Sequence, residues 1–183
     1  MKERKYKSDW ASETRVDEKT GRERQVPVYR GSWFSMASGQ SKKELLLYSL
    51  LPWIAFLAFL LLYFRLNFPG SHVLYIFLPA ALSLFPCLYW AMGAWGVFRA
   101  PERMTRLQKE TGIGRILRSS AACVIFLCAA LIGELVFLLS GADFAREWPG
   151  TLLLLAAAAV SFAAAAFFRN VNRRLSEERS ANS

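Results

Sequence analysis

Four long apolar runs constrain this chain more than any other feature of its sequence. They cover residues 45–64, 72–98, 116–139 and 151–168. Each is near or above the roughly 18–20 residues that a helix needs to cross a hydrocarbon core of about 30 Å. A helix of a soluble protein keeps a polar face, whereas these runs are apolar on almost every face. The sequence therefore predicts an all-α integral membrane protein, built as a bundle of four transmembrane helices.

Basic residues predict how these helices are oriented. Residues 1–44 hold 11 of the 23 Lys and Arg residues, the loop 99–118 holds six, and the tail 169–183 holds four. The other side of the membrane has only Arg65 and Arg146. Positive charge marks the cytoplasmic segments of membrane proteins. We therefore expect a multi-pass protein of the cell membrane, plasma or bacterial inner membrane, with both termini in the cytoplasm.

This topology divides the chain into three parts. Residues 1–44 form a basic arm, residues 45–168 form the transmembrane domain, and residues 169–183 form a polar tail. In the arm, a turn around Gly21 separates two strand-like segments, which favours a β-hairpin. The high charge and low apolar content of the same residues favour disorder, so both hypotheses stay open. The aromatic residues of segment 31–36 are typical of an anchor at the membrane surface.

The net charge of +9 at pH 7 predicts a partner class. Topology and attraction to anionic lipid account for it, so we expect no nucleic-acid partner. Four basic residues of the middle loop are candidate contacts for anionic lipid headgroups at the cytoplasmic face or for an acidic protein: Arg99, Arg103, Arg106 and Lys109. The alternative is a solvated loop that only sets the topology.

Cysteine and histidine positions argue against a cofactor. Cys87, Cys123 and Cys128 all fall inside the apolar runs, their number is odd, and none forms a C-x-x-C motif. We expect neither a disulfide nor a zinc site, and interpret the thiols as buried apolar groups. His72 is the only histidine, so a bis-histidine haem within one chain is excluded. Because no nucleophile and base converge, we expect no enzyme activity.

The second and fourth runs have features of helix packing. Pro79 and Pro86 are candidate kinks, seven positions apart and on nearly the same helix face. The carbonyls that they free either line a polar site with Ser83 or are satisfied by neighbouring helices. In the fourth run, Ala156–Ala159 and Ala163–Ala166 give a small surface that lets helices approach closely. This predicts a compact bundle in a homo-oligomer or beside another membrane protein.

Glu134 lies inside the third apolar run. It shares a helix face with Ser119 and Cys123, which predicts that it points into the bundle. A depth estimate places it about 6 Å below the outer boundary of the hydrocarbon core. Arg65 ends the first helix at that boundary and His72 lies at a similar level, so we expect Arg65 as the partner of Glu134, with His72 second.

Two functional hypotheses follow. The first is a non-enzymatic membrane protein that acts by assembly, as a scaffold or accessory subunit of a membrane complex. The alternative is a small oligomeric transporter or channel that uses Glu134, because ionisable residues inside membranes are functional candidates by default. Near the boundary, the same carboxylate can also serve as a simple link between helices.

Overall fold

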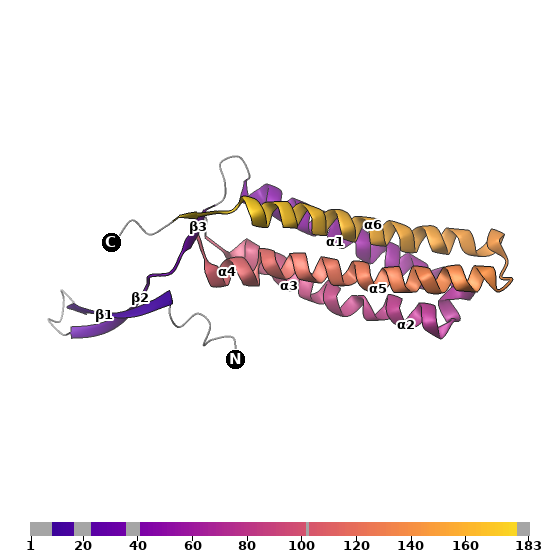
Figure 1. The fold of residues 1–183 in the computed structure, drawn as a ribbon, viewed down its shortest axis with the longest axis horizontal. Helices are drawn as coiled ribbons and strands as arrows, with labels where there is room; N and C mark the ends of the chain where they lie inside the picture. The colour runs from indigo at the N-terminus through magenta and orange to yellow at the C-terminus, as the bar shows by residue number, and fades with distance from the viewer. Residues whose placement is uncertain (1–8, 17–22, 36–40, 102, 179–183) are drawn as a thin grey trace.

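The computed structural model describes residues 9–16, 23–35, 41–101 and 103–178 of the 183-residue chain. The fold is mostly helical, and its long helices lie side by side in an elongated bundle (Figure 1). Four helical segments are long and apolar enough to cross a membrane: Lys43–Arg65, Leu74–Arg99, Arg106–Leu139 and Phe144–Arg174.

Two of these segments are each made of two helices. A short 3-10 helix, η2, precedes the second segment. The helices are α1 (Lys42–Arg65), η2 (Pro69–His72), α2 (Leu74–Leu82), α3 (Leu84–Arg99), α4 (Arg106–Thr111), α5 (Ile113–Leu139) and α6 (Phe144–Arg174).

The two ends of the bundle differ. At one end, short connections join α1 to α2 and α5 to α6, and we call it the short-loop end. At the other end lie the strands, and we call it the sheet end (Figure 1). Within the bundle, α5 packs against α6, α3 and α2, while α1 packs against α6 and α3. α5 therefore packs against three other helices of the bundle.

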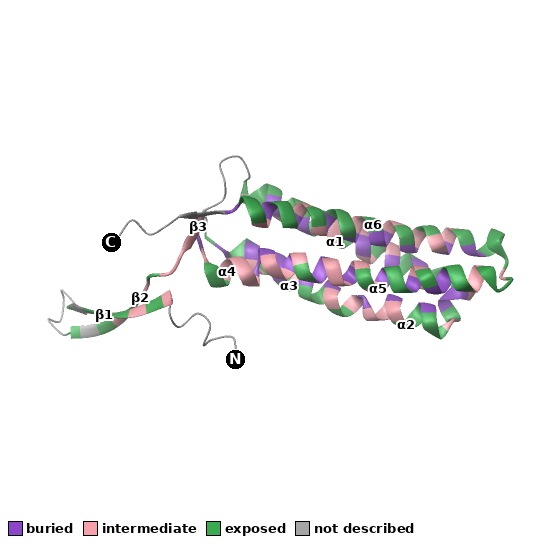
Figure 2. Ribbon diagram, in the orientation of Figure 1, coloured by how far each residue is buried: buried purple, intermediate pink, exposed green. Residues whose placement is uncertain are grey.

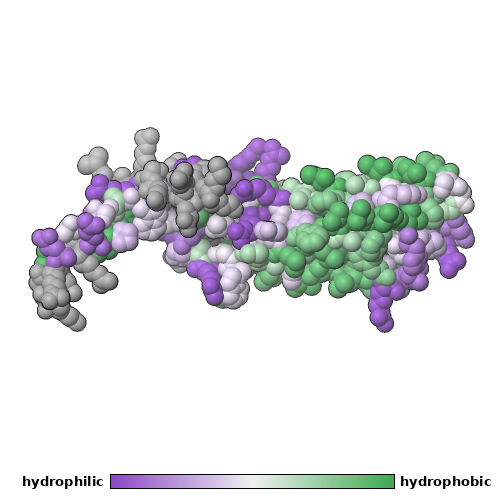
Figure 3. Space-filling view, turned by 90° about the horizontal axis from the view of Figure 1, so that it is seen from below, coloured by the Kyte–Doolittle hydropathy of each residue, from purple (hydrophilic) through white to green (hydrophobic). Residues whose placement is uncertain are grey.

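The outside of the bundle is apolar. Buried residues line the inside of the helices and exposed ones face outward (Figure 2). Leu, Ile and Phe side chains are prominent among the exposed residues. Figure 3 shows hydrophobic residues, in green, over much of the bundle on the face in view. Soluble monomers rarely expose a contiguous apolar patch beyond a few hundred Å². This surface fits the hydrocarbon of a membrane.

The second span breaks between its two prolines. α2 ends and α3 begins around Ser83, with Pro79 inside α2 and Pro86 in the first turn of α3, where a missing N–H costs little. Ser83 is buried, and its hydroxyl donates to the Ala80 carbonyl at 2.6 Å. The Cys123 thiol donates to the Ser83 carbonyl at 3.6 Å. These two contacts are to the carbonyls of Ala80 and Ser83, which flank the break.

The fourth span begins earlier than the sequence predicts. α6 starts just after Asp143, whose side chain accepts a hydrogen bond from the Ala145 N–H at 3.0 Å. Pro149 lies inside the helix and deprives the Ala145 carbonyl of its usual donor. A Cβ on Gly150 would lie 2.9 Å from the Phe68 ring. This glycine therefore permits close packing against the other loop and does not form a turn.

A small sheet joins three distant segments at the sheet end. β3 (Trp33–Ser35) pairs antiparallel with β4 (Arg103–Thr105) and with β5 (Ser176–Glu178), in the order β4-β3-β5. Phe34 lies opposite Met104, which is buried. The segment expected to be an aromatic membrane anchor is therefore a central strand.

A second strand pair lies beyond this sheet in Figure 1. β1 (Trp10–Val16) pairs antiparallel with β2 (Glu23–Tyr29), with Trp10 opposite Tyr29. The turn predicted around Gly21 lies outside the described residues.

Candidate functional site

Glu134 is completely buried on α5. The residues that share its helix face, Ser119, Cys123 and Ala130, are also buried. Gly133 lets α2 come close, because a Cβ there would lie 3.1 Å from the Tyr75 carbonyl oxygen. The carboxyl group therefore points into the bundle at the short-loop end, as the helical periodicity predicts.

The two cations expected beside Glu134 are not there. Arg65 and His72 are exposed, and neither forms an ion pair or hydrogen bond with Glu134 among the described residues. The backbone of η2 occupies the space instead. A Cβ on Gly70 would lie 2.7 Å from Glu134 Oε2, so the carboxyl group packs directly against this glycine. The predicted pairing with Arg65 or His72 is thus absent from the structure.

The neighbour of Glu134 is a second buried carboxyl group. Glu147, in the first turn of α6, is 1% exposed. Its carboxyl lies within hydrogen-bonding distance of that of Glu134. The Gly70 N–H donates to Glu147 Oε1 at 3.1 Å, and the Thr151 hydroxyl lies 3.3 Å from Glu134 Oε1. Each glutamate therefore has one oxygen that accepts a hydrogen bond.

The remaining oxygen atoms of this site have no donor. Glu134 Oε2, Glu147 Oε2 and the Tyr63 hydroxyl are buried without a hydrogen-bond partner in the described part of the chain. Tyr63 lies on α1, is 0% exposed and interacts electrostatically with both glutamates. Unpaired buried polar groups are rare in native structures and need an explanation. We call Tyr63, Glu134 and Glu147 the carboxyl site.

The local fold brings the two carboxyl groups to one level. α5 and α6 are antiparallel neighbours joined by a short connection, in which Gly141 has φ +100°. Glu134 lies near the end of α5 and Glu147 near the start of α6, so both face the space under η2.

The sequence prediction missed Glu147 because it began the fourth span at residue 151. One signal favoured a helix instead. Asp143 is a good N-cap, and Glu147 and Thr151 follow it at helical spacing. Proline near a helix start is compatible with that assignment.

The predicted basic contacts at the sheet end do not converge. The Arg99 guanidinium lies 4.8 Å from the centre of the Trp95 ring, and Lys109 Nζ lies 4.1 Å from the centre of the Phe34 ring. Both contacts are cation–π interactions, which hold a charge against an apolar surface.

The other two basic residues are arranged differently. Arg106 Nε lies 3.7 Å from Glu110 Oε1, one turn further along α4, and Arg103 is exposed on β4. The four cations thus spread over the sheet end and do not form one pocket.

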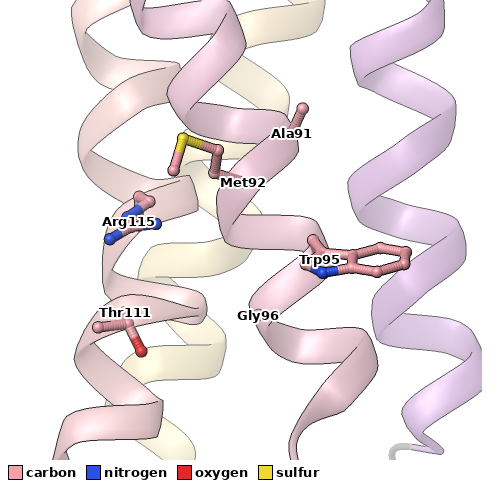
Figure 4. A pocket seen from close by; sticks show the side chains of 6 residues that line it. All are labelled: Ala91, Met92, Trp95, Gly96, Thr111 and Arg115. Atoms are coloured by element: carbon pink, nitrogen blue, oxygen red, sulfur yellow. The ribbon is translucent and has the colours of Figure 1, made fainter.

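An apolar groove opens near these residues. It lies between α3 and the junction of α4 with α5, and has a volume of about 630 Å³. Figure 4 shows Arg115 and Thr111 on one side and Met92 and Trp95 on the other. The Arg115 guanidinium makes no ion pair or hydrogen bond within the described ranges. The groove therefore combines an apolar surface with one cation.

The three thiols also differ in environment. Cys87 and Cys123 are buried as expected, whereas Cys128 is exposed on the outside of α5. All three are free. Within the described residues, no group of three or more His, Cys, Asp and Glu side chains is placed to hold a metal ion.

No protein-family model, curated protein or solved structure matches this chain. Its function is therefore inferred from the residues and their geometry.

Proposed function

We infer that this protein is a non-enzymatic, multi-pass protein of the cell membrane that acts by assembly, as a scaffold or accessory subunit of a membrane complex. The observation that carries this proposal is the sheet β4-β3-β5. It ties the N-terminal arm, the middle loop and the C-terminal tail into one platform on the bundle. A platform of this kind presents a fixed surface to a partner.

The orientation is part of the proposal. Most Lys and Arg residues of the chain fall in segments at the sheet end, whereas the short-loop end has only Arg65 and Arg146. Positive charge stays on the cytoplasmic side of membranes. The sheet end is then cytoplasmic, with both termini.

Open strand edges support a protein partner. β4 and β5 are the edges of the three-stranded sheet, and β1 and β2 form an antiparallel pair with two edges. An extended partner segment can add to such an edge through backbone hydrogen bonds. The surrounding basic side chains favour an acidic segment.

The outer face of α6 supports a partner within the membrane. Ala159, Ala163 and Ala166 are exposed and recur at helical spacing on one face. Small residues at this spacing let two transmembrane helices approach closely. The partner helix belongs to a second copy or to another membrane protein.

Native mass spectrometry tests the proposal on the protein extracted gently from its own membrane. We expect a mass that contains a second protein, which is reduced when Arg103 on β4 is replaced by Glu. The matched control is Arg146→Glu at the short-loop end, which should retain the partner. A bare monomer for the wild-type protein would contradict assembly as the function.

A second candidate function has one specific observation in its favour. Glu134 is buried beside Glu147 in a span, as a coupling carboxyl group of a small oligomeric transporter or channel would be. In that case Glu134→Gln should fold normally in liposomes but lose ion- or proton-linked uptake. Normal uptake by this variant would exclude Glu134 as the coupling group.

A further inference from the structure

We propose that Glu134 and Glu147 form a proton-binding site, in which the two carboxyl groups hold one proton between them at the short-loop end of the bundle. This inference stands on the geometry of the carboxyl site. It depends on neither function proposed above, because a subunit that acts by assembly and a transporter can both contain such a site.

Two ionised carboxylates at this site would lack a compensating positive charge. Both carboxyl groups are almost fully buried, so water does not screen their repulsion. Ionised carboxylates this close cannot both persist in a buried site without a compensating positive charge. No Lys, Arg or His side chain pairs with either glutamate within the described residues. The positive charge that compensates the two carboxylates therefore has to come from a bound ligand, which we propose is a proton.

The hydrogen bonding of the two carboxyl groups also indicates a shared proton. The two carboxyl groups lie within hydrogen-bonding distance of each other, and a hydrogen bond between carboxyl oxygens needs a hydrogen atom. Each group also has an Oε2 atom without a donor. One proton on either Oε2 makes that oxygen a donor and the other an acceptor. A single proton therefore gives both Oε2 atoms a hydrogen-bond partner and removes one of the two negative charges.

The hydrogen-bond donors around the two glutamates limit which oxygen atoms can bind the proton. Gly70 N–H and the Thr151 hydroxyl already bond to the Oε1 atoms, which leaves the Oε2 atoms for the shared proton. The Tyr63 hydroxyl on α1 is buried near the pair but makes no hydrogen bond to it among the described residues. A metal ion fits less well, since it requires more ligands than these two carboxyl groups supply.

Other charged groups at this end lie apart from the site. Tyr63 is the titratable group that faces the pair from α1, and η2 contributes only backbone at Gly70. The exposed groups are Arg65 on α1, His72 on η2, Arg146 on α6 and Asp143 at the start of α6. Proton exchange with water proceeds through the short-loop end, where Thr151 is partly exposed.

Losing the proton has a structural consequence. The proton leaves to water and two carboxylates remain, one on α5 and one on α6, both against Gly70 of η2. Their repulsion acts to separate α5, α6 and η2 at the short-loop end. Above about pH 5 the carboxyl groups of the unfolded chain are ionised. The folded protein therefore binds one proton more than the unfolded chain until the site itself loses its proton. Folding stability therefore falls as the pH rises.

Thermal unfolding of the full-length protein in detergent tests the site from about pH 5 to about pH 9. We expect the melting temperature of the wild type to fall by about 3 °C or more over this range. Glu147→Gln should flatten the decline, because the amide N–H donates to Glu134 without a proton from solution. Asp143→Asn is the matched control, since it removes a carboxylate at the same end and should keep the wild-type decline.

Infrared spectroscopy supplies a readout that does not depend on a stable single variant. The wild type should show a protonated-carboxyl band near neutral pH that disappears at alkaline pH. The double variant Glu134→Gln/Glu147→Gln should lack that band. Absence of the band from the wild type would overturn the proposal. So would stabilisation of the wild type by added Ca²⁺ or Na⁺ that is lost in the double variant, because the occupant would then be a metal cation.

Discussion

The backbone N–H of Gly70 donates a hydrogen bond to Glu147 Oε1 at 3.1 Å, although the two residues lie 77 positions apart. This contact joins η2, in the connection between α1 and α2, to the first turn of α6. It places a glycine where a side chain would collide with Glu134 as well, since a Cβ on Gly70 would lie 2.7 Å from Glu134 Oε2. The carboxyl site therefore depends on a residue without a side chain.

Replacing Gly70 with Ala should destabilise the protein. The added methyl group must displace one carboxyl group from a packed site, and overpacking of this kind costs about 1–3 kcal/mol. The melting temperature in detergent should fall accordingly. Gly114→Ala is the control, because the nearest atom to its Cβ would be Arg118 Nη2 at 3.5 Å. Equal losses for both variants would contradict the close approach at Gly70.

The burial of Glu134 was predictable from sequence, whereas its neighbour was not. Helical periodicity alone places Glu134 on the inner face of its span. Glu147 precedes Pro149 and Gly150, and that pair favours a turn when only local sequence is considered. The helix continues through them because Gly150 packs against Phe68 of the other connection, a contact that no local pattern reveals.

At the sheet end, too, local sequence patterns did not reveal contacts between distant segments. The apolar runs predicted the four membrane-spanning segments, because a span needs a long uninterrupted signal. A strand of three residues has no such periodicity. β3 forms because residues 103–105 and 176–178 meet it, and these partners are distant in sequence. The composition of β3, with its aromatic residues, therefore predicted a membrane anchor and not a strand.

The β1–β2 pair should be visible by hydrogen exchange. Backbone amides that bond across the pair should exchange more slowly than amides of an unstructured peptide. We expect slowed exchange in alternating residues of Trp10–Val16 and Glu23–Tyr29. Uniformly fast exchange over both strands would show that the arm is disordered.

Tyr29 should hold this strand pair against the middle loop. Its hydroxyl accepts a hydrogen bond from the Arg106 N–H at 3.1 Å and donates to the Ser32 carbonyl at 3.0 Å. Tyr29→Phe removes both bonds and should speed exchange of the Arg106 amide. Trp10→Phe keeps them and serves as the control. An unchanged rate at Arg106 in Tyr29→Phe would contradict the contact.

Arg115 should select anionic lipid in the groove between α3 and α5. A phosphate headgroup on the guanidinium would place an acyl chain against Met92 and Trp95. Arg115→Gln should reduce retention of phosphatidylglycerol relative to phosphatidylcholine in native mass spectra. Arg118→Gln is the matched control, because the exposed Arg118 side chain donates to the Gly114 carbonyl at 3.1 Å. Equal retention of anionic lipid by both variants would exclude the groove as its site.

Photo-cross-linking in the native membrane tests whether the sheet end is a cytoplasmic platform for a partner. A photoreactive amino acid is placed at Arg103 on β4 or, as the comparison, at Arg146 at the short-loop end. We expect a protein adduct from position 103 that forms with a cytoplasmic or membrane partner, and none from position 146. A protein adduct from position 146 alone, or lipid adducts alone from both positions, would contradict it.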